Sequence, residues 1–289
     1  MTHPSPAPSL APPDWPHCGH GTTSEDPVGC RGIHVPGHTA CLAHLTDLDR
    51  GAYLAGLAPG SDIDHCGTAF TEPLLGALLD ALRDPATGHP CFGSAWFNSV
   101  TFQGAARFES ATFQDTAQFN SATFHGPAEF DSATFQDSAE FDMAIFQGTA
   151  NFKSATFQDT AWFDSATFSG DTEFALATST NRAWFRRARF EMTAYMSFTS
   201  GGLVMLDGAV FHQPVSVFIV TRRVSCGRTR WAATATLHLL FAELHLNDAV
   251  FEHPVVVTGS RGALSREDLL PEGLDDQFQG VGDPSAAPR

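Results

Sequence analysis

The sequence predicts an all-β fold, a solenoid of short strands with a small helical, Cys- and His-containing cap at its N-terminal end. Three observations lead to this fold class. From Phe97 to Phe174 the chain repeats itself every eleven residues, with Phe residues spaced alternately five and six positions apart. A small residue, usually Ala, stands two positions before most of these Phe residues, and turn-forming residues follow them. Self-similarity at a fixed short period indicates identical units stacked along an axis.

The residues of the repeat favour strands and corners over a helix. An eleven-residue period is also that of a right-handed helical supercoil. At about 100° per residue, however, the Phe and Ala positions scatter around a helix and form no stripe. The intervening Thr, Ser, Asn, Gly and Asp are poor helix formers. An Ala-x-Phe triplet instead fits the alternation of a strand, with Ala and Phe on one face. We therefore expect three-residue strands joined by corners, with the Phe residues stacked inside.

The A-x-F-x-x tract resembles the pentapeptide-repeat family, in the variant with a central Phe. The resemblance implies a right-handed quadrilateral β-helix with four short sides per coil, in which two eleven-residue units form a coil of about 22 residues. The extra residue in every second unit departs from the five-residue repeat, and we expect it to bulge alternate corners. The resemblance is strong from Ala95 to about Phe190. Residues 17–83 and 203–257 are also similar in overall pattern to the flanking segments of Phe-type members from actinobacteria.

Two segments precede the repeats. Residues 1–16 are rich in Pro, Ala and Ser and lack the basic and apolar parts of a signal peptide, so we expect a disordered tail. Residues 17–92 are expected to form a Cys/His capping module, because an uncapped coil offers bare N–H and C=O groups to other chains. Within this module, residues 41–57 and 71–83 have helical patterns, and Thr71 is a suitable N-cap for the second helix.

The repeats are expected to form the β-helix over residues 93–257. The pattern is regular over 95–174, and its register falters over 175–182. Degenerate coils are expected over 175–257, because Ala keeps its place two positions before the later Phe residues. Residues 258–289 are charged, contain Gly and Pro and have no period, so we expect a second disordered tail there.

The cap contains one candidate metal site. Cys18, Cys30, Cys41 and His44 have the spacing C-x11-C-x10-C-x2-H. Three thiolates and one imidazole can form the tetrahedral ligand set of a structural zinc ion, and small Gly- and Pro-rich modules often depend on such a metal. The alternative is that these are ordinary packed thiols beside a solvent-facing His. Four further side chains in the module compete as ligands: His17, His20, His38 and Cys66.

The formal net charge is −16, but it is unevenly spread. Residues 97–174 hold eleven acidic and two basic side chains, a balance of −9, whereas residues 182–230 hold eight Arg and two acidic residues, a balance of +6. An acidic rod with a basic segment suits protein partners. Asp115, Asp137 and Asp159 recur at the same place in every second unit and are expected to form a column. This column either attracts a cation or a basic partner, or consists of solvated corner residues.

The sequence contains none of the common catalytic or phosphate-binding motifs, so we expect no enzyme, no catalytic residues and no cofactor apart from the zinc ion. Six Cys without a secretory signal argue against a disulfide framework. No run of about 18 apolar residues is present, so we expect no transmembrane span and no membrane partner. These observations predict a cytoplasmic protein.

The predicted function is that of a non-enzymatic protein-interaction scaffold whose protein partner the sequence does not identify. We expect specific recognition at the irregular stretch Ala175–Arg230 and at the Cys/His cap, and the charge balance disfavours direct binding of nucleic acid. The resemblance also implies an alternative, since some pentapeptide-repeat proteins are acidic DNA mimics that bind a type II topoisomerase, inhibiting gyrase or protecting it from quinolones. The acidic coils favour this alternative. The Arg-rich coils and the lack of an evident dimerising C-terminal helix oppose it.

Overall fold

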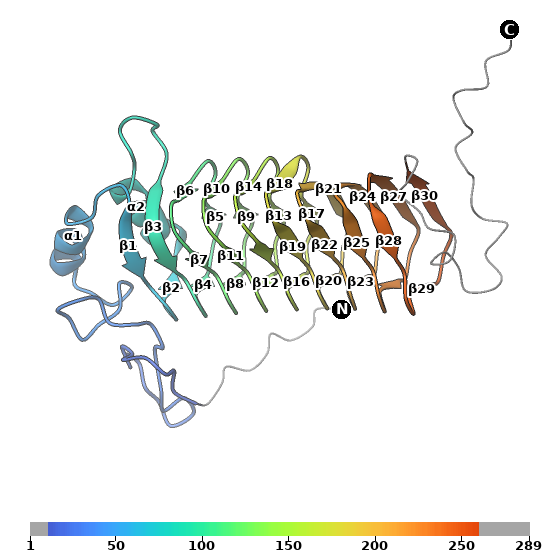
Figure 1. The fold of residues 1–289 in the computed structure, drawn as a ribbon. Helices are drawn as coiled ribbons and strands as arrows, with labels where there is room; N and C mark the ends of the chain where they lie inside the picture. The colour runs from blue at the N-terminus through green and yellow to red at the C-terminus, as the bar shows by residue number, and fades with distance from the viewer. Residues whose placement is uncertain (1–10, 260–289) are drawn as a thin grey trace, which may run out of the picture.

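The computed structural model describes residues 11–259, which form a rod of stacked coils with the cap at its N-terminal end (Figure 1). Two short helices, α1 (Asp47–Ala55) and α2 (Glu72–Ala81), lie at this end, and strands make up the rest of the regular structure described. The expected fold class, a β-solenoid with a small helical Cys/His cap, is confirmed. Among residues 11–259, no helix combines the length and the apolar character needed to cross a membrane.

The two expected tails lie mainly outside the described residues, at 1–10 and 260–289. Some residues assigned to these tails are described by the structure, and they lie in the cap and in the last strand. Trp15 donates its indole N–H to the carbonyl oxygen of Arg31 at 2.8 Å, so it belongs to the cap. At the other end, Thr258 and Gly259 lie in the last strand of the rod.

Each regular coil has four short sides, which we call A to D in chain order. Thr112 and Phe113 pair in parallel with Thr134 and Phe135 of the next coil, and these pair with Thr156 and Phe157 of the coil after that. The partners in each pairing are two eleven-residue units apart in the sequence, so two units make one coil, as the resemblance implied. Parallel pairing of equivalent sides holds the coils together.

The strands of each side have the following bounds. Side A consists of β2 (Ala69–Phe70), β4 (Thr101–Phe102), β8 (Thr123–Phe124), β12 (Ile145–Phe146), β16 (Thr167–Phe168), β20 (Arg189–Phe190), β23 (Val210–Phe211), β26 (Arg230–Trp231) and β29 (Val250–Phe251). Side B consists of β5 (Ala106–Arg107), β9 (Ala128–Glu129), β13 (Ala150–Asn151) and β17 (Thr172–Glu173). Side C consists of β6 (Thr112–Phe113), β10 (Thr134–Phe135), β14 (Thr156–Phe157) and β18 (Ala177–Ser179). Side D consists of β1 (Ser61–Asp64), β7 (Ala117–Gln118), β11 (Ala139–Glu140), β15 (Ala161–Trp162), β19 (Arg182–Trp184), β22 (Leu203–Met205), β25 (Arg223–Ser225) and β28 (Glu243–His245).

Five longer strands each cover two sides. At the N-terminal end, β3 (Cys91–Trp96) pairs with β6 and β7, so it covers sides C and D. The other four are β21 (Ala194–Ser200), β24 (Val215–Val220), β27 (Ala235–Leu240) and β30 (Val255–Gly259). They stack on one another and cover sides B and C, because β21 pairs with both β17 and β18.

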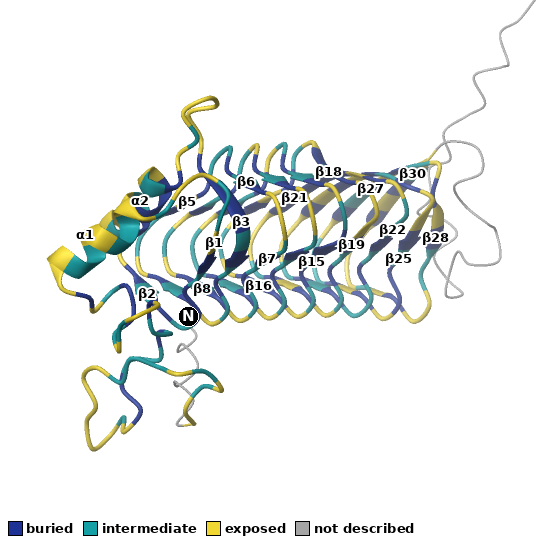
Figure 2. Ribbon diagram, turned by 60° about the vertical axis from the view of Figure 1, so that its left-hand side comes forward, coloured by how far each residue is buried: buried dark blue, intermediate teal, exposed yellow. Residues whose placement is uncertain are grey.

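The core of the regular coils is a set of Phe columns that run along the rod. Phe130 lies parallel between Phe108 and Phe152, with ring centroids 5.0 Å apart on each side, and meets Phe119 edge-on at 5.5 Å. Offset stacks and edge-to-face pairs are the favoured geometries of aromatic rings. Each buried Phe contributes about 1.5–3 kcal/mol relative to exposure. Figure 2 shows the buried residues along the inner faces of the coils, with exposed residues at many of the corners.

The corners of the regular coils are of two kinds, which alternate. In one kind, Ala133 donates its N–H to the carbonyl oxygen of Phe130 at 3.1 Å, and Ser132 between them has a φ of 57°. This is a β-turn with its third residue in the left-handed region. The other kind has one more residue and contains either Gly or Asp. At Gly148 a Cβ would lie 2.6 Å from the backbone of Gly126 in the preceding coil, so this corner approaches its neighbour closely.

The sequence irregularity at residues 175–182 does not break the coil register, contrary to our expectation. Phe157 of β14 pairs with Ser179 of β18, which is still two full units further along the chain. The Ser179 hydroxyl donates to the carbonyl oxygens of Arg182 and Asp159, at 2.9 and 3.0 Å. A small polar side chain thus takes a Phe position, and the backbone pairing keeps the register unchanged.

The register changes later, in two steps of one residue. Thr172 pairs with Ala194 in the register of the regular coils, but Ala177 pairs with Phe198, where that register would give Thr199. One residue is therefore lost from the corner between sides B and C, and β21 runs straight through it. Leu203 then pairs with Arg223, one position earlier than the pairing of β21 with β24 would give, so a second residue is lost between sides C and D. Each of the last coils is thus shorter than a regular coil by these two positions.

The solenoid begins earlier than residue 93, inside the segment expected to be the cap. Strands β1 and β2 pair in parallel with β3 and β4, so a first coil already starts at Ser61. In that coil α2 takes the place of the side B strand and packs beside β5. Thr71 caps α2 by accepting the Leu74 N–H, as expected. The first helix is shorter than the expected 41–57, because Thr46 caps it and it begins at Asp47.

Candidate functional site

The structure brings the four predicted metal ligands together. The ligand atoms of Cys18, Cys30, Cys41 and His44 all lie within 4.8 Å of one another. His44 Nδ1 is 3.5 Å from Cys18 Sγ and 3.4 Å from Cys41 Sγ, and the sulfurs of Cys30 and Cys41 are 3.6 Å apart. Cys41 is buried, and His44 is exposed. This cluster has the composition and the closeness of a site able to hold a metal ion.

Two local structures position these ligands. The segments around Cys18 and Cys30 run side by side, since Cys18 donates its N–H to Gly32 O at 2.9 Å and Gly19 donates to Cys30 O at 2.8 Å. Gly29 has a φ of 64°, and a Cβ there would lie 2.8 Å from Gly19 O, so this approach requires glycine. In the second structure, the carbonyl oxygen of Cys41 accepts the N–H of His44 at 2.9 Å. This turn places the two side chains on one side.

The three thiols influence each other's ionisation. The hydrogen bond from Cys41 lowers the pKa of the Cys30 thiol to about 5. The same contact raises the pKa of Cys41, because a second thiolate beside the first would be repelled and because the group is buried. A cation between the sulfurs would therefore stabilise the charge of a second thiolate.

The side chains that the sequence offered as competing ligands do not join the cluster. The His20 ring stacks on the His44 ring, with centroids 4.1 Å apart and planes 20° apart. Cys66 is buried elsewhere, and burial raises the pKa of its thiol to about 12. His17 and His38 are also outside the group. Among the described residues, the candidate metal ligands of this cluster are thus the four that the sequence predicted.

A fully buried His under the cap was missed by sequence reasoning. His65 lies between Tyr53 of α1 and Phe70, and its Nε2 is 3.3 Å from the Tyr53 hydroxyl. Burial lowers the pKa of His65 to about 3, so the ring is neutral at physiological pH. A neutral buried imidazole held by a hydroxyl is a packing residue. The one signal that could have predicted its burial is its position between β1 and β2, and the sequence pattern does not define the bounds of these two strands.

Two of the three Asp residues expected to form a column, Asp137 and Asp159, accept hydrogen bonds within the rod. Thr116 donates its hydroxyl to Asp137 of the next coil at 3.1 Å, and Ser138 donates to Asp159 at 3.3 Å. Asn181 also donates its amide to Asp159, at 2.9 Å. Hydroxyl and amide donors therefore compensate part of the like-charge repulsion, which favours the interpretation of these Asp residues as corner residues.

Several Arg side chains of the basic segment, residues 182–230, form ion pairs with carboxylates. Half of its eight Arg residues are in ion pairs, and the pairs are Arg186–Asp164, Arg189–Glu191, Arg223–Glu243 and Arg230–Glu252. Exposed pairs of this kind contribute little to stability, but they neutralise the surface locally. The stretch is therefore less basic to a partner than its composition indicates.

The outer face of the four long strands β21, β24, β27 and β30 carries no Asp, Glu, Lys or Arg. We call this surface the neutral face, and its exposed or half-buried residues are Tyr195, Thr199, Ser216, Phe218, Val220, Thr236, His238, Leu240, Val256 and Thr258. Ser197 alternates with them along β21 but is buried. Tyr195 is 47% exposed, Phe218 39% and Val256 46%. On side B of the regular coils, the equivalent positions include Glu129 and Glu173. The change from a charged to an uncharged surface thus follows the merging of sides B and C.

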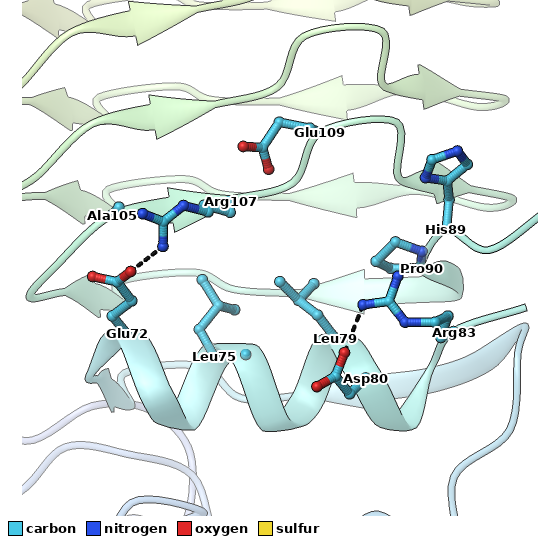
Figure 3. Close-up of a pocket in the computed structure, with 11 residues that line it drawn as sticks. Glu72, Leu75, Leu79, Asp80, Arg83, His89, Pro90, Ala105, Arg107 and Glu109 are labelled. Atoms are coloured by element: carbon cyan, nitrogen blue, oxygen red, sulfur yellow. Dashed lines mark hydrogen bonds and ion pairs between the residues drawn. The ribbon is translucent and has the colours of Figure 1, made fainter.

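A groove lies between α2 and the first coils, and Figure 3 shows the side chains that line it. Arg107 of β5 pairs with Glu72 at the start of α2, and Arg83 pairs with Asp80 at 2.6 Å. Glu109 lies at the next corner, where burial raises the pKa of its carboxyl group. The Arg107–Glu72 pair joins the helix to the first coils. The charged groups here are engaged in structural contacts.

Comparison with known proteins identifies the repeats. Residues 91–134, 130–178 and 152–200 match the family model described as pentapeptide repeats, with nine copies. No curated protein and no solved structure matches the chain.

Proposed function

The repeats of residues 91–200 belong to the pentapeptide-repeat family, and from this premise we propose that the chain is a non-enzymatic interaction scaffold for a protein partner. Solenoids bind through extended surfaces. Fully buried Phe and Ala side chains fill the interior of the regular coils, which leaves the outside of the rod for recognition. All six Cys are free thiols, which fits a reducing compartment such as the cytoplasm.

The neutral face is the observation that carries this proposal. Its exposed Tyr195, Phe218 and Val256 lie on β21, β24 and β30, and these strands and β27 pair side by side, so they form one continuous surface. Aromatic residues are enriched at the centres of protein interfaces, and charged residues are depleted there. The partner would therefore present a neutral, partly apolar surface. Two strands of this face, β21 and β24, lie in the stretch Ala175–Arg230, where the sequence predicts recognition.

Capture of partners by surface variants tests the proposal. The immobilised full chain is compared with Phe218→Asp, which places a charge on the neutral face, and with Leu176→Asp. Leu176 is the matched control, because it is 68% exposed at a corner of the regular coils. A partner should be retained by the wild type and by Leu176→Asp, and its retention should fall at least about tenfold with Phe218→Asp. Identical sets of retained proteins for all three chains would refute the assignment of this face.

A second candidate function is the acidic DNA mimic that binds a type II topoisomerase. The balance of −9 over residues 97–174 favours it. The pairing of Asp137 and Asp159 with hydroxyl donors, and the neutral face beyond the acidic coils, count against it. A gyrase supercoiling assay separates the two candidates. Inhibition at micromolar concentrations or below would support the mimic, and no inhibition at high concentration and low salt would reject it.

We further propose that the Cys/His cluster is a structural metal site, with zinc as its ion. Four protein ligands complete a tetrahedral coordination shell and leave no open position for a substrate. The cluster thus fits a non-enzymatic chain, in which a metal stabilises a cap of limited core.

A further inference from the structure

We propose that one Zn²⁺ bound by the Sγ atoms of Cys18, Cys30 and Cys41 and by Nδ1 of His44 is the lock that fastens the N-terminal segment onto the first coil of the solenoid. This inference rests on the structural role proposed for the cluster and is independent of the scaffold function. Nδ1 is the imidazole nitrogen that would bind the ion, and the ion would hold the N-terminal segment in place. Loss of the ion would uncover the first coil.

Three of the six distances between the ligand atoms match those of a tetrahedral zinc site. With Zn–S bonds of about 2.3 Å and a Zn–N bond of about 2.0–2.1 Å, the edges of a tetrahedron are about 3.8 Å between sulfurs and about 3.6 Å from sulfur to nitrogen. The observed Cys30–Cys41 edge is 3.6 Å, and the edges from His44 Nδ1 to Cys18 and Cys41 are 3.5 and 3.4 Å. These three edges thus have the lengths of a zinc tetrahedron, and all four ligand atoms lie within 4.8 Å of one another.

Hydrogen bonds among these groups do not account for their convergence. Nδ1 of a neutral His44 either accepts or donates a single hydrogen bond, depending on the tautomer, yet the sulfurs of Cys18 and Cys41 both lie within hydrogen-bonding distance of it. Thiols are also weak donors. A divalent cation at the centre would interact with all four atoms and would stabilise the thiolates that otherwise repel one another.

The donor set selects zinc among the common divalent ions. Soft thiolate ligands in a closed tetrahedral set favour zinc, whereas calcium and magnesium require oxygen ligands and higher coordination numbers. Two features match the surroundings of such ligands. Gly32 donates its N–H to Cys30 Sγ at 3.4 Å, which stabilises a thiolate, and the His20 ring fixes the plane of His44 by stacking.

The cluster is joined directly to the first coil through residues 31–33. Ile33 donates its N–H to Cys66 O at 2.8 Å, in the loop between β1 and β2. Gly32 is buried, and a Cβ there would lie 2.8 Å from Cys41 Sγ and 3.0 Å from Thr68 Oγ1. Gly67 of the same loop is so close that its Cβ would lie 2.4 Å from Arg31 O. The metal ligands and the first coil thus both contact one short segment, residues 31–33.

The residues that the lock holds down cover the end of the rod. Val35, Leu42 and Leu45 are buried in the same core as Phe70 of the first coil and Phe97. Without the metal, three separate segments carrying Cys18, Cys30 and Cys41 would have to be ordered by this small apolar contribution alone. Loop-closure entropy opposes that order, and metal binding free energy offsets it. Release of the cap would leave the edges of β1 and β2 free for pairing with another chain.

Metal analysis of the full chain, purified without a metal-chelating tag, tests the site. We expect about one zinc per chain, and the Co²⁺-substituted protein should show the intense visible bands of tetrahedral Co²⁺ with thiolate charge transfer. His44→Cys should keep the metal, because Sγ can replace Nδ1, whereas Cys30→Ser combined with Cys41→Ser should lose it. Cys91→Ser is the matched control, since Cys91 lies in β3 and outside the cluster. A zinc-free wild type that is fully folded would overturn both the site and the lock.

Hydrogen exchange before and after chelation tests the lock separately. Removal of zinc should raise exchange at the amides of Ile33 and of β1 by at least about tenfold, while the amides of β10 and β14 in the regular coils stay protected. Size-exclusion chromatography of the chelated protein should show self-association that zinc reverses. If zinc is bound but its removal changes neither exchange at β1 nor the oligomeric state, the site stands and the lock is wrong.

Discussion

The regular coils and the last coils build the same rod by different rules. In the regular coils each turn takes two full eleven-residue units, has four sides and encloses columns of Phe. In the last coils each turn is two positions shorter, and one long strand replaces sides B and C. The aromatic column on side A continues into the last coils. There Phe190, Phe211 and Trp231 stack, with ring centroids 4.7 and 4.4 Å apart.

The difference teaches that corners, more than core residues, determine the length of a coil. Where Phe157 is followed by Ser179 in its column, the register of the regular coils persists. Where the corner between sides B and C loses a residue, the register shifts although Phe198 still supplies an aromatic side chain. A strand that no longer turns brings neighbouring side chains into one plane, and this produces the neutral face.

The largest expected effect is loss of a ring from a Phe column. Phe130→Ala should lower the free energy of unfolding by about 3–5 kcal/mol, because the ring is fully buried between two parallel neighbours in a rigid stack. Val217→Ala in the last coils should cost only about 2 kcal/mol, since it removes two buried carbons. Denaturant unfolding followed by circular dichroism measures both. Equal losses of unfolding free energy for the two variants would show that the Phe columns contribute no more to stability than the aliphatic core of the last coils.

The regular coils could be predicted almost completely, because every unit repeats one packing solution and the period is visible in the letters. The last coils could not, since the two lost residues fall at Met196–Ser197 and at Thr221–Arg222, where the regular spacing of Phe residues has ended and the letters no longer mark the register. The start at Ser61 was hidden for a related reason. In the first coil α2 replaces a strand, and a helical pattern interrupts the period of the solenoid.

The second expected effect concerns the close corner of the regular coils. Gly148→Ala should destabilise the rod by about 1–3 kcal/mol, because the new Cβ would meet the backbone of Gly126 at 2.6 Å and the backbone would have to shift. Gly76→Ala is the control, since nothing lies within 4 Å of that position in α2. This control should raise stability by about 0.5–1 kcal/mol. Thermal unfolding compares the two variants, and a neutral Gly148→Ala would mean that the coils are not held this closely.

The residues of the candidate metal site could be predicted from the sequence, but the position of the site against the first coil could not. The ligands Cys18, Cys30, Cys41 and His44 could be predicted from their spacing, because Cys is rare in the chain and thiolate and imidazole groups have a specific chemistry toward metal ions. Their contact with the first coil depends on Gly32 and on the loop at Cys66, and no sequence pattern marks which loop a glycine will lie against. The neutral face was missed for a similar reason, since alternation in β24 and β27 is visible only after the strands are known to be long.

The third expected effect tests the corner residue that the last coils have lost. Leu176 has a φ of 58°, a conformation that costs an L-residue about 1–2 kcal/mol and glycine almost nothing. Leu176→Gly should therefore raise the free energy of unfolding by about 0.5–1 kcal/mol after the greater flexibility of unfolded glycine is subtracted. Gly208→Ala, at a φ of 71° in the later coils, should lower it by about 1 kcal/mol. The idea that this corner stores strain fails if both variants are neutral in denaturant unfolding.

The smallest expected effect is a pH dependence at the corner between sides D and A. Asp142 accepts the Asp164 N–H at 2.8 Å, just as Asn120 accepts the Asp142 N–H one coil earlier at 3.0 Å. Burial, followed by the charges of Asp164 and Glu140, raises the pKa of the Asp142 carboxyl above its ordinary value of 3.8. A carboxyl group with a raised pKa favours the folded state while it is protonated, and this advantage is lost as the pH rises through the raised pKa.

Asp142→Asn keeps the acceptor oxygen and removes the charge. The variant should therefore be more stable than the wild type at neutral pH, by less than about 1 kcal/mol because the site is partly exposed. Its advantage should grow as the pH rises above 3.8 and become constant once the wild-type carboxyl is fully ionised. Unfolding curves recorded between pH 3 and pH 8 measure this difference. An advantage that is the same at both ends of the range would show that the amide acts through packing and not through the lost charge. The regular coils use Asn and Asp interchangeably at this corner up to Arg186, where Asp164 pairs with the guanidinium and the ladder of carboxylates ends.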